Sequence, residues 1–174
     1  AHITYFMNGG YEKEFDGETH HIIPSPKVST YDLKPEMSAD EVTRALLQAI
    51  DSRKYDFLAV NYANPDMVGH TGNLEAAIKA VNVVDNCISK LLDAMANVGG
   101  STFITADHGN LDEMIDHETG QTLTNHSLNK VDFIHVPRPG DKTLGKLKAG
   151  GKLSDIAPTM LHALGMEIPN EMDG

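Results

Sequence analysis

The chain has 174 residues, of which 40% are hydrophobic, so it is long enough to bury the core of one domain. Its 25 acidic and 14 basic residues give a formal net charge of -11 at pH 7, and this negative field argues against binding to nucleic-acid phosphates or anionic membrane surfaces. It contains no apolar run of membrane-spanning length, and its single cysteine excludes an internal disulfide and suits a reducing compartment, so we expect a cytoplasmic protein.

The first part of the chain carries strand and helix signals in alternation. Residues 1–7 are β-prone and stop before a glycine pair, and 11–35 are irregular with three prolines. Ser38 and Glu41 have the spacing of a capping box, which predicts the start of a helix. Residues 56–62 (DFLAVNY) are an apolar run typical of a strand buried on both faces. The helix between them has apolar residues at helical spacing: Val42, Ala45, Leu46, Ala49 and Ile50.

A long amphipathic helix is predicted next, and the glycine pair at 99–100 should end it. Cys87 lies beside its apolar stripe, so we interpret this cysteine as packed rather than reactive. Two short strands, at 101–105 and 131–136, and a last helix at 155–164 complete the pattern. The apolar stripe of the long helix alternates steps of four and three: Ala77, Val81, Val84, Ile88, Leu91, Met95 and Val98.

The order of these elements predicts the fold class. Strands that alternate with helices argue for an α/β sandwich with a largely parallel sheet. The chain shows no internal repeat and no interior domain boundary, so we expect residues 1–174 to form one unit. In open sheets of this kind, ligands bind outside the carboxyl ends of the strands, which is where a site should lie.

Two of the predicted strands run into side chains that suit a metal ion. Asp66 and His70 follow the first strand, Asp107 and His108 follow the second, and His126 comes after a polar loop. Carboxylates and imidazoles suit a borderline divalent ion such as Mn²⁺ or Zn²⁺. Adjacent ligands on a tight turn can also bridge two close metals, as in phosphoryl transfer. By position alone, the same residues fit ordinary turns and helix caps equally well.

The sequence around these residues resembles the metal-binding segments of the cofactor-independent phosphoglycerate mutases, a family of the alkaline phosphatase superfamily. The strings NYANPDMVGHTGN (61–73) and TADHGN (105–110) carry the resemblance. It extends over essentially the whole chain, and it implies an alkaline-phosphatase-like, three-layer α/β sandwich. Further matching strings are FMNGG, FDGE, IPSPKVSTYDLKPEMSA and SDIAPTMLHALG.

The resemblance also implies a role for each candidate ligand. Asp66, His70 and His126 would form one manganese site, and Asp107 and His108 would contribute to a second, which an aspartate and a nucleophilic serine complete. That serine would carry the phosphoryl group between the 3- and 2-positions of glycerate, a step of glycolysis, without a bisphosphoglycerate cofactor. The intact enzyme would hold two Mn²⁺, with Mg²⁺, Zn²⁺ or Co²⁺ as substitutes, and phosphoglycerate would be its substrate.

The family's serine segment and its inserted substrate domain have no match in this chain. We therefore expect residues 1–174 to be the C-terminal portion of the metal-binding phosphatase domain, incomplete at its N-terminal side, with the nucleophile outside the chain. By itself the chain should bind metal and be inactive as a mutase. An uncovered sheet edge would favour self-association.

Three other interpretations stay open. Another phosphohydrolase or phosphomutase of the same superfamily would use metal ligands of the same types, although the sequence at 25–39 argues against it. A metal-binding module without catalysis is a second alternative, and a purely structural domain is the third. If the chain binds a metal ion, the purely structural domain is excluded and the other interpretations stay open.

Several polar residues near the candidate ligands need an interpretation. We expect Asn64 and Asn110 to support the ligands as hydrogen-bond donors. Ser25 and Ser127 have no base partner in the pattern, so neither is interpreted as a nucleophile. Three acidic residues after the second ligand pair are interpreted as a solvated face that aids the capture of cations: Asp112, Glu113 and Asp116.

Overall fold

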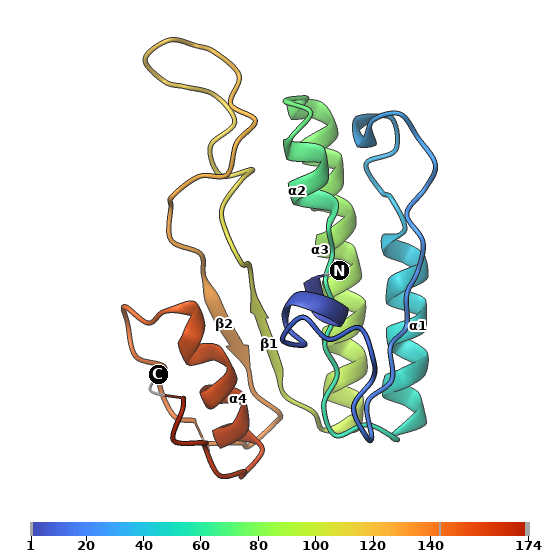
Figure 1. Ribbon diagram of the computed structural model, residues 1–174, viewed down its shortest axis with the longest axis vertical. Helices are drawn as coiled ribbons and strands as arrows, with labels where there is room; N and C mark the ends of the chain where they lie inside the picture. Colours follow the sequence, from blue (N-terminus) through green and yellow to red (C-terminus); the bar gives the residue numbers. More distant parts are fainter. Residues whose placement is uncertain (1, 143, 173–174) are drawn as a thin grey trace.

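The structure is a computed structural model that describes residues 2–142 and 144–172. Figure 1 shows helices α1 (Ala39–Ser52), α2 (Asn64–Gly69) and α3 (Leu74–Val98) together, the ribbon of strands β1 (Thr102–Thr105) and β2 (Phe133–Val136) next to them, and α4 (Ile156–Ala163) on the side of the ribbon away from these helices. No helix in the described ranges is long and apolar enough to cross a membrane. The elements in chain order are η1 (His2–Phe6), η2 (Tyr31–Leu33), α1 (Ala39–Ser52), α2 (Asn64–Gly69), α3 (Leu74–Val98), β1 (Thr102–Thr105), β2 (Phe133–Val136), η3 (Leu153–Asp155) and α4 (Ile156–Ala163).

The long helix α3 has clear start and stop signals. The side chain of Asn73 accepts a hydrogen bond from the backbone N–H of Ala76 at 3.1 Å, which caps the helix. Gly99 ends it with a φ of 75°, a left-handed conformation that glycine adopts without strain. The predicted helix and its glycine stop are confirmed. The fully packed face of α3 is made mostly of small residues: Ala76, Ala77, Ala80, Cys87 and Leu91.

The short helix α2 packs against the first turns of α3. Val68 is completely buried there, in a cluster with Met114 and the alanines of α3. Because alanine side chains are short, the two helix backbones can approach closely. Burial of a valine side chain contributes about 1.5–3 kcal/mol, so this contact fixes α2 firmly on α3.

Helix α1 begins where the sequence predicts, but the capping box does not form. The hydroxyl of Ser38 donates to the carbonyl oxygen of Pro24 at 2.8 Å instead of capping the helix. This bond ties the irregular N-terminal segment to the start of α1. The buried Thr43 of α1 shares a hydrogen bond of 2.6 Å with the hydroxyl of Tyr62, which anchors the chain that leads into α2.

The predicted parallel sheet is not observed in the described part of the chain. That part contains one sheet, of the antiparallel strands β1 and β2, with Thr102 opposite Val136. Residues 2–6 form a π-helical turn rather than a strand, and 57–63 have no regular secondary structure. A strand inside a sheet needs a neighbouring strand at each edge, which pairs its backbone N–H and C=O groups. No described segment pairs with 57–63, and Phe57 is 51% exposed.

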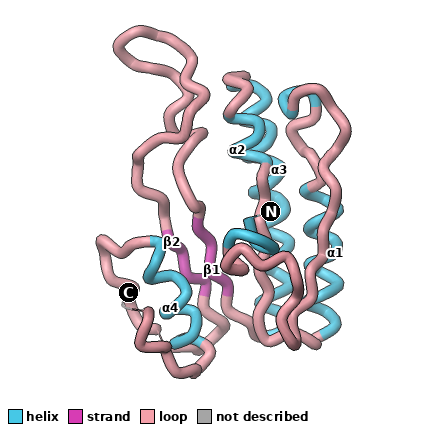
Figure 2. Tube along the Cα trace, in the orientation of Figure 1, coloured by secondary structure: helices cyan, strands magenta, loops and turns pink. Residues whose placement is uncertain are grey.

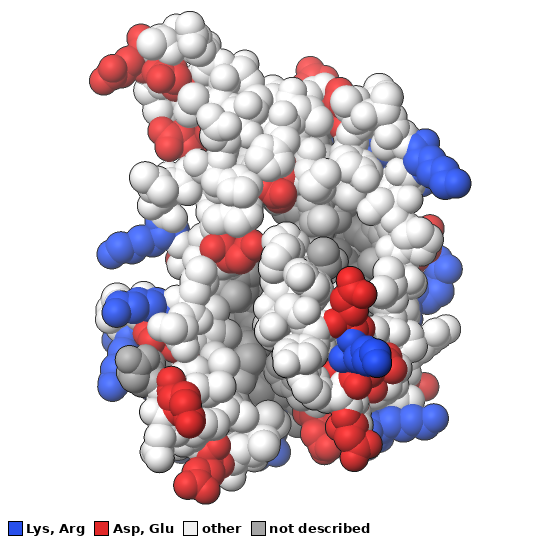
Figure 3. Space-filling model, viewed as in Figure 1, with Lys and Arg blue, Asp and Glu red and all other residues white. Residues whose placement is uncertain are grey.

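The β1–β2 ribbon carries a long loop at one end. Figure 2 shows this loop rising from both strands, and its outer part projects beyond the helices. A bridge between Ile115 and Thr122 closes the projecting part. In Figure 3, acidic side chains lie along the edge of the projecting tip, and no Lys or Arg is visible on it. Such a tip has a negative potential, which attracts cations.

The burial of Cys87 predicts a cysteine that reacts only after unfolding. A thiol reagent such as dithionitrobenzoate should label the native chain slowly and label it fully in denaturant, because the thiol is 1% exposed. A Ser25→Cys variant is the matched control, since Ser25 is exposed and should add one thiol that reacts at once. Fast labelling of Cys87 in the native chain would contradict its assignment to the core.

Candidate metal centre

The first two candidate ligands lie one helical turn apart. Asp66 is in the first turn of α2 and His70 directly follows the helix, still with helical dihedrals. An i, i+4 spacing therefore places both side chains on one face, and the Asp66 Oδ1 to His70 Nε2 distance is 3.1 Å. Asn64 is expected from the sequence to donate to the ligands, but the Nδ2 of this buried residue donates instead to the carbonyl oxygen of Pro35 at 2.8 Å, which holds the start of α2.

The third candidate, His126, comes from the loop that returns to β2. Its Nε2 lies 2.9 Å from Asp66 Oδ1 and 3.2 Å from His70 Nε2. Three potential ligand atoms, from residues that are up to 60 positions apart, thus meet at one point. The structure brings together the three residues that the family resemblance groups as one site.

A backbone contact determines the tautomer of His70. Its Nδ1 lies 2.7 Å from the carbonyl oxygen of Thr124, and a carbonyl oxygen can only accept. Nδ1 must therefore carry the proton, which leaves Nε2 of a neutral ring with a lone pair. That lone pair faces a carboxylate oxygen 3.1 Å away, an arrangement that is repulsive unless a proton or a metal ion lies between them.

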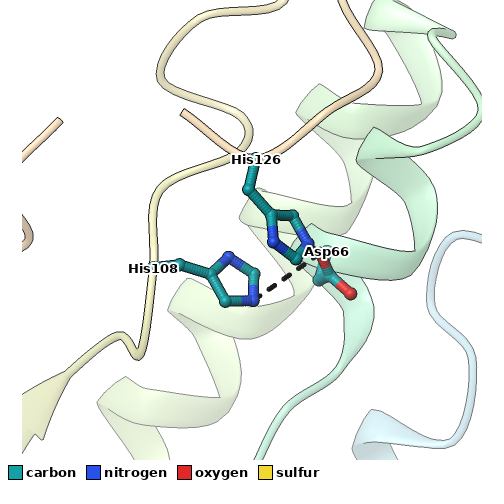
Figure 4. A group of neighbouring side chains, drawn as sticks. All are labelled: Asp66, His108 and His126. Carbon is teal, nitrogen blue, oxygen red and sulfur yellow. Dashed lines mark hydrogen bonds and ion pairs between the residues drawn. The ribbon is translucent and has the colours of Figure 1, made fainter. Parts of the chain in front are cut away.

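The second candidate pair lies at the edge of the same cluster. His108 Nε2 is 3.9 Å from Asp66 Oδ1 and 3.6 Å from Asp107 Oδ2. The His108 ring stacks on the His126 ring with centroids 3.6 Å apart and planes 16° apart. Asp107 is more exposed, and its Oδ2 also lies 3.7 Å from His2 Nδ1. Figure 4 shows Asp66, His108 and His126 converging from separate segments.

Asn110 supports Asp66 as predicted. This residue is buried, and its Nδ2 donates to Asp66 Oδ1 at 2.9 Å. The contact depends on Gly69, since a Cβ at Gly69 would overlap Asn110 Oδ1 and lie 2.7 Å from Leu111 Cδ2. The missing side chain of Gly69 therefore allows the loop after β1 to approach α2.

The donor set fits a divalent cation. Ligands about 2.1 Å from a cation are about 3.0 Å apart at right angles and about 3.4 Å apart at tetrahedral angles. The three distances among Asp66, His70 and His126 are 2.9, 3.1 and 3.2 Å. Ligand atoms of Asp66, His108 and His126 also lie within 4.8 Å of one another. One carboxylate with several imidazoles suits Mn²⁺, Co²⁺ or Zn²⁺.

Contacts of the acidic residues in the loop were not foreseen from the sequence. Asp112 is exposed, as the solvated-face interpretation predicts, and its Oδ2 also accepts hydrogen bonds from Ser127 and Asn129. Asp116 caps its own turn, and the backbone N–H groups of Thr119 and then Glu118 hold its pKa below the usual value. Neither set of contacts follows a helical or strand period, so no sequence pattern reveals them.

Comparison with known proteins places these observations in a family. The chain is 56% identical, over all 174 residues, to the 2,3-bisphosphoglycerate-independent phosphoglycerate mutases of Clostridium beijerinckii and Clostridioides difficile. It spans 33% and 34% of their lengths, about a third. A crystal structure of Leishmania mexicana phosphoglycerate mutase at low cobalt concentration matches 99% of the chain with a TM-score of 0.89 and 33% identity, and 34% of that chain is covered.

The structural match confirms the predicted alkaline-phosphatase-like metalloenzyme fold at the level of the whole chain, although not the details of its sheet. A sequence model of a protein family, described as the metalloenzyme superfamily, matches residues 1–168. This match covers the α2 segment and both loops that bear the candidate ligands. The chain belongs to the metalloenzyme superfamily.

Proposed function

We propose that this chain is the metal-binding part of a cofactor-independent phosphoglycerate mutase, which interconverts 3- and 2-phosphoglycerate in the cytoplasm without bisphosphoglycerate. The observation that carries the proposal is the convergence of Asp66, His70 and His126 at ligand-to-ligand distances. The relatives of the same name support it, because they are 56% identical over the whole chain.

Within this proposal, Asp66, His70 and His126 hold one Mn²⁺, and Asp107 and His108 contribute to a second. Bound cations of this kind supply Lewis acidity, which offsets the negative charge that builds up on phosphoryl oxygens. The protein's own contribution is orientation. The Thr124 carbonyl holds His70 in the tautomer with a free Nε2, and Asn110 orients the Asp66 carboxylate.

The proposal places the nucleophilic serine outside this chain. Ser127 is close to the cluster in sequence, but its hydroxyl donates to Asp112 at 2.8 Å. The side-chain hydrogen bond from Asn129, and then that from Ser127, hold the pKa of Asp112 below its usual value. A carboxylate with a lowered pKa is a weak base, so this pair is poorly suited to activate a hydroxyl at neutral pH.

We also propose that residues 56–62 become a strand of a three-layer sandwich with a largely parallel sheet in a protein of the relatives' length. Two observations support this. The segment is apolar yet unpaired, with Phe57 51% exposed, and the chain spans only about a third of its relatives. Pairing with further strands would satisfy its backbone and bury its side chains.

The metal site predicts one dominant binding event. Titration calorimetry with Mn²⁺ should show it, because three protein ligands are gathered at one point. His70→Ala should weaken binding by more than the roughly 10–100-fold that the loss of a supporting residue costs, since it removes a ligand. His162→Ala is the control, because His162 is an exposed residue of α4. Equal affinities for the two variants would refute the ligand assignment.

A chimera tests the proposed activity. Replacing the matching third of the Clostridium beijerinckii relative with this chain should give an enzyme that interconverts 3- and 2-phosphoglycerate in Mn²⁺. His70→Ala should abolish the activity of that chimera, and His162→Ala should not. The chain alone should show no turnover, because its described part offers no activated serine. Mutase activity in the chain alone, or an inactive but folded and metal-bound chimera, would contradict the proposal.

A further inference from the structure

The carboxylate of Asp112 connects the two loops that meet at the metal centre. Its Oδ2 accepts a hydrogen bond from Ser127 Oγ at 2.8 Å and another from Asn129 Nδ2 at 2.6 Å. Ser127 Oγ in turn accepts the backbone N–H of Asn129 at 3.3 Å. The Asp112 side chain, in the loop after β1, thus holds Ser127 and Asn129, which lie just after His126 in the loop before β2.

A backbone contact reinforces this connection. Ser127 N–H donates to the carbonyl oxygen of Gly109 at 3.0 Å, and the two residues form an antiparallel bridge. A Cβ at Gly109 would overlap Ser127 Oγ and would lie 2.7 Å from Asp112 Oδ1. Gly109 therefore provides the space in which the hydroxyl and the carboxylate meet.

The residues in this contact are next to the candidate ligands. His126 precedes Ser127, and His108 precedes Gly109. The bridge between Ser127 and Gly109 therefore sets the spacing of the two imidazoles, which stack at 3.6 Å. Asp66 and His70 are positioned by a packed helix, whereas His108 and His126 depend on these loops.

Apolar packing contributes little to the position of the returning loop. Leu128 is fully exposed, and residues 124–126 and 128–130 are all exposed. Ordering the backbone of this stretch costs conformational entropy, and none of these exposed side chains offsets that cost by burial. Polar contacts must therefore offset the cost of ordering the loop. The hydrogen bonds to Asp112 are of the strongest type, because the acceptor is an ionised carboxylate.

We propose that Asp112 is a positioning residue for the metal centre. Its hydrogen bonds to Ser127 and Asn129 hold the His126 imidazole so that Nε2 meets Asp66 and His70. This inference rests on the proposed function in one respect, which is that a divalent cation is what these atoms bind. The hydrogen bonds themselves can be tested without any metal.

The metal-free test is amide hydrogen exchange at Ser127, whose N–H donates to Gly109. Asp112→Ala should raise the exchange rate by about tenfold or more, because the loop opens more often. Asn129→Ala, which keeps the charge of Asp112, should raise it in the same direction. Glu113→Ala is the matched control, since it removes the same charge one residue along from an exposed side chain. Unchanged exchange in Asp112→Ala and Asn129→Ala would overturn the inference.

The metal-bound test measures affinity for Mn²⁺ by calorimetry and the visible absorption of bound Co²⁺. Asp112→Ala should weaken Mn²⁺ binding by about 10–100-fold. Its Co²⁺ spectrum should move away from that of the unmodified chain toward that of His126→Ala, because the imidazole is no longer held in place. A merely destabilised chain would keep the original spectrum in its folded molecules. Glu113→Ala should keep both the affinity and the spectrum.

The two tests separate the inference from the function on which it rests. If the unmodified chain binds neither Mn²⁺ nor Co²⁺, the proposed function fails, and the exchange rates still decide whether Asp112 holds the loop. If Asp112→Ala does not fold, Asn129→Ala supplies the same comparison with a milder change. Equal losses of affinity in Glu113→Ala and Asp112→Ala would show that charge alone acts, which overturns the positioning role.

Discussion

Side chains from three segments of the chain converge on one carboxylate oxygen, Oδ1 of Asp66. Asp66 Oδ1 lies 2.9 Å from Asn110 Nδ2, 2.9 Å from His126 Nε2 and 3.1 Å from His70 Nε2. Only the amide of Asn110 is certain to donate, and the tautomer of His70 points a lone pair at the same oxygen. The cluster thus concentrates negative and lone-pair density at a point that only a proton or a cation can stabilise. In the proposed metal centre, a bound cation would supply that stabilisation.

Small residues at the contacts between segments let three parts of the chain approach that oxygen closely. Alanines on α3 let α2 lie close, and Gly69 lets the loop with Asn110 lie close to α2. Gly109 does the same between the two loops of the ribbon. In each place a larger residue would separate elements whose polar atoms must be about 3 Å apart. Close packing therefore serves the geometry of the site as well as the stability of the core.

The sequence predicts best those features that depend on local periodicity. Gly99 ends α3 as the glycine pair predicts, and Asp66 and His70, which are four residues apart, lie on one face of a helical turn. The strand at 56–62 was predicted from its composition, but pairing depends on distant partners that composition does not contain. The Asp112 contacts joined residues 15 and 17 positions apart in loops, where no period operates. Ser38 shows the limit of local motifs, because its hydroxyl donates to the Pro24 carbonyl, 14 residues away, and does not cap its own helix.

The two halves of the metal centre differ in rigidity, and this difference determines how a cation would act on the chain. Asp66 and His70 are held by a packed helix and bear little ordering cost, whereas His108 and His126 are held in exposed loops by polar contacts. Binding energy at Nε2 of His126 must therefore offset loop entropy as well as dehydration of the ion. A cation that binds the ordered loops stabilises them by mass action, so loop order and metal occupancy should rise together. Asp107 and His108, whose Oδ2 and Nε2 atoms lie 3.6 Å apart, supply only two of the ligands that the proposed second site needs. In the proposed metal centre, occupancy of the site around Asp66 would therefore order the loop that bears His126.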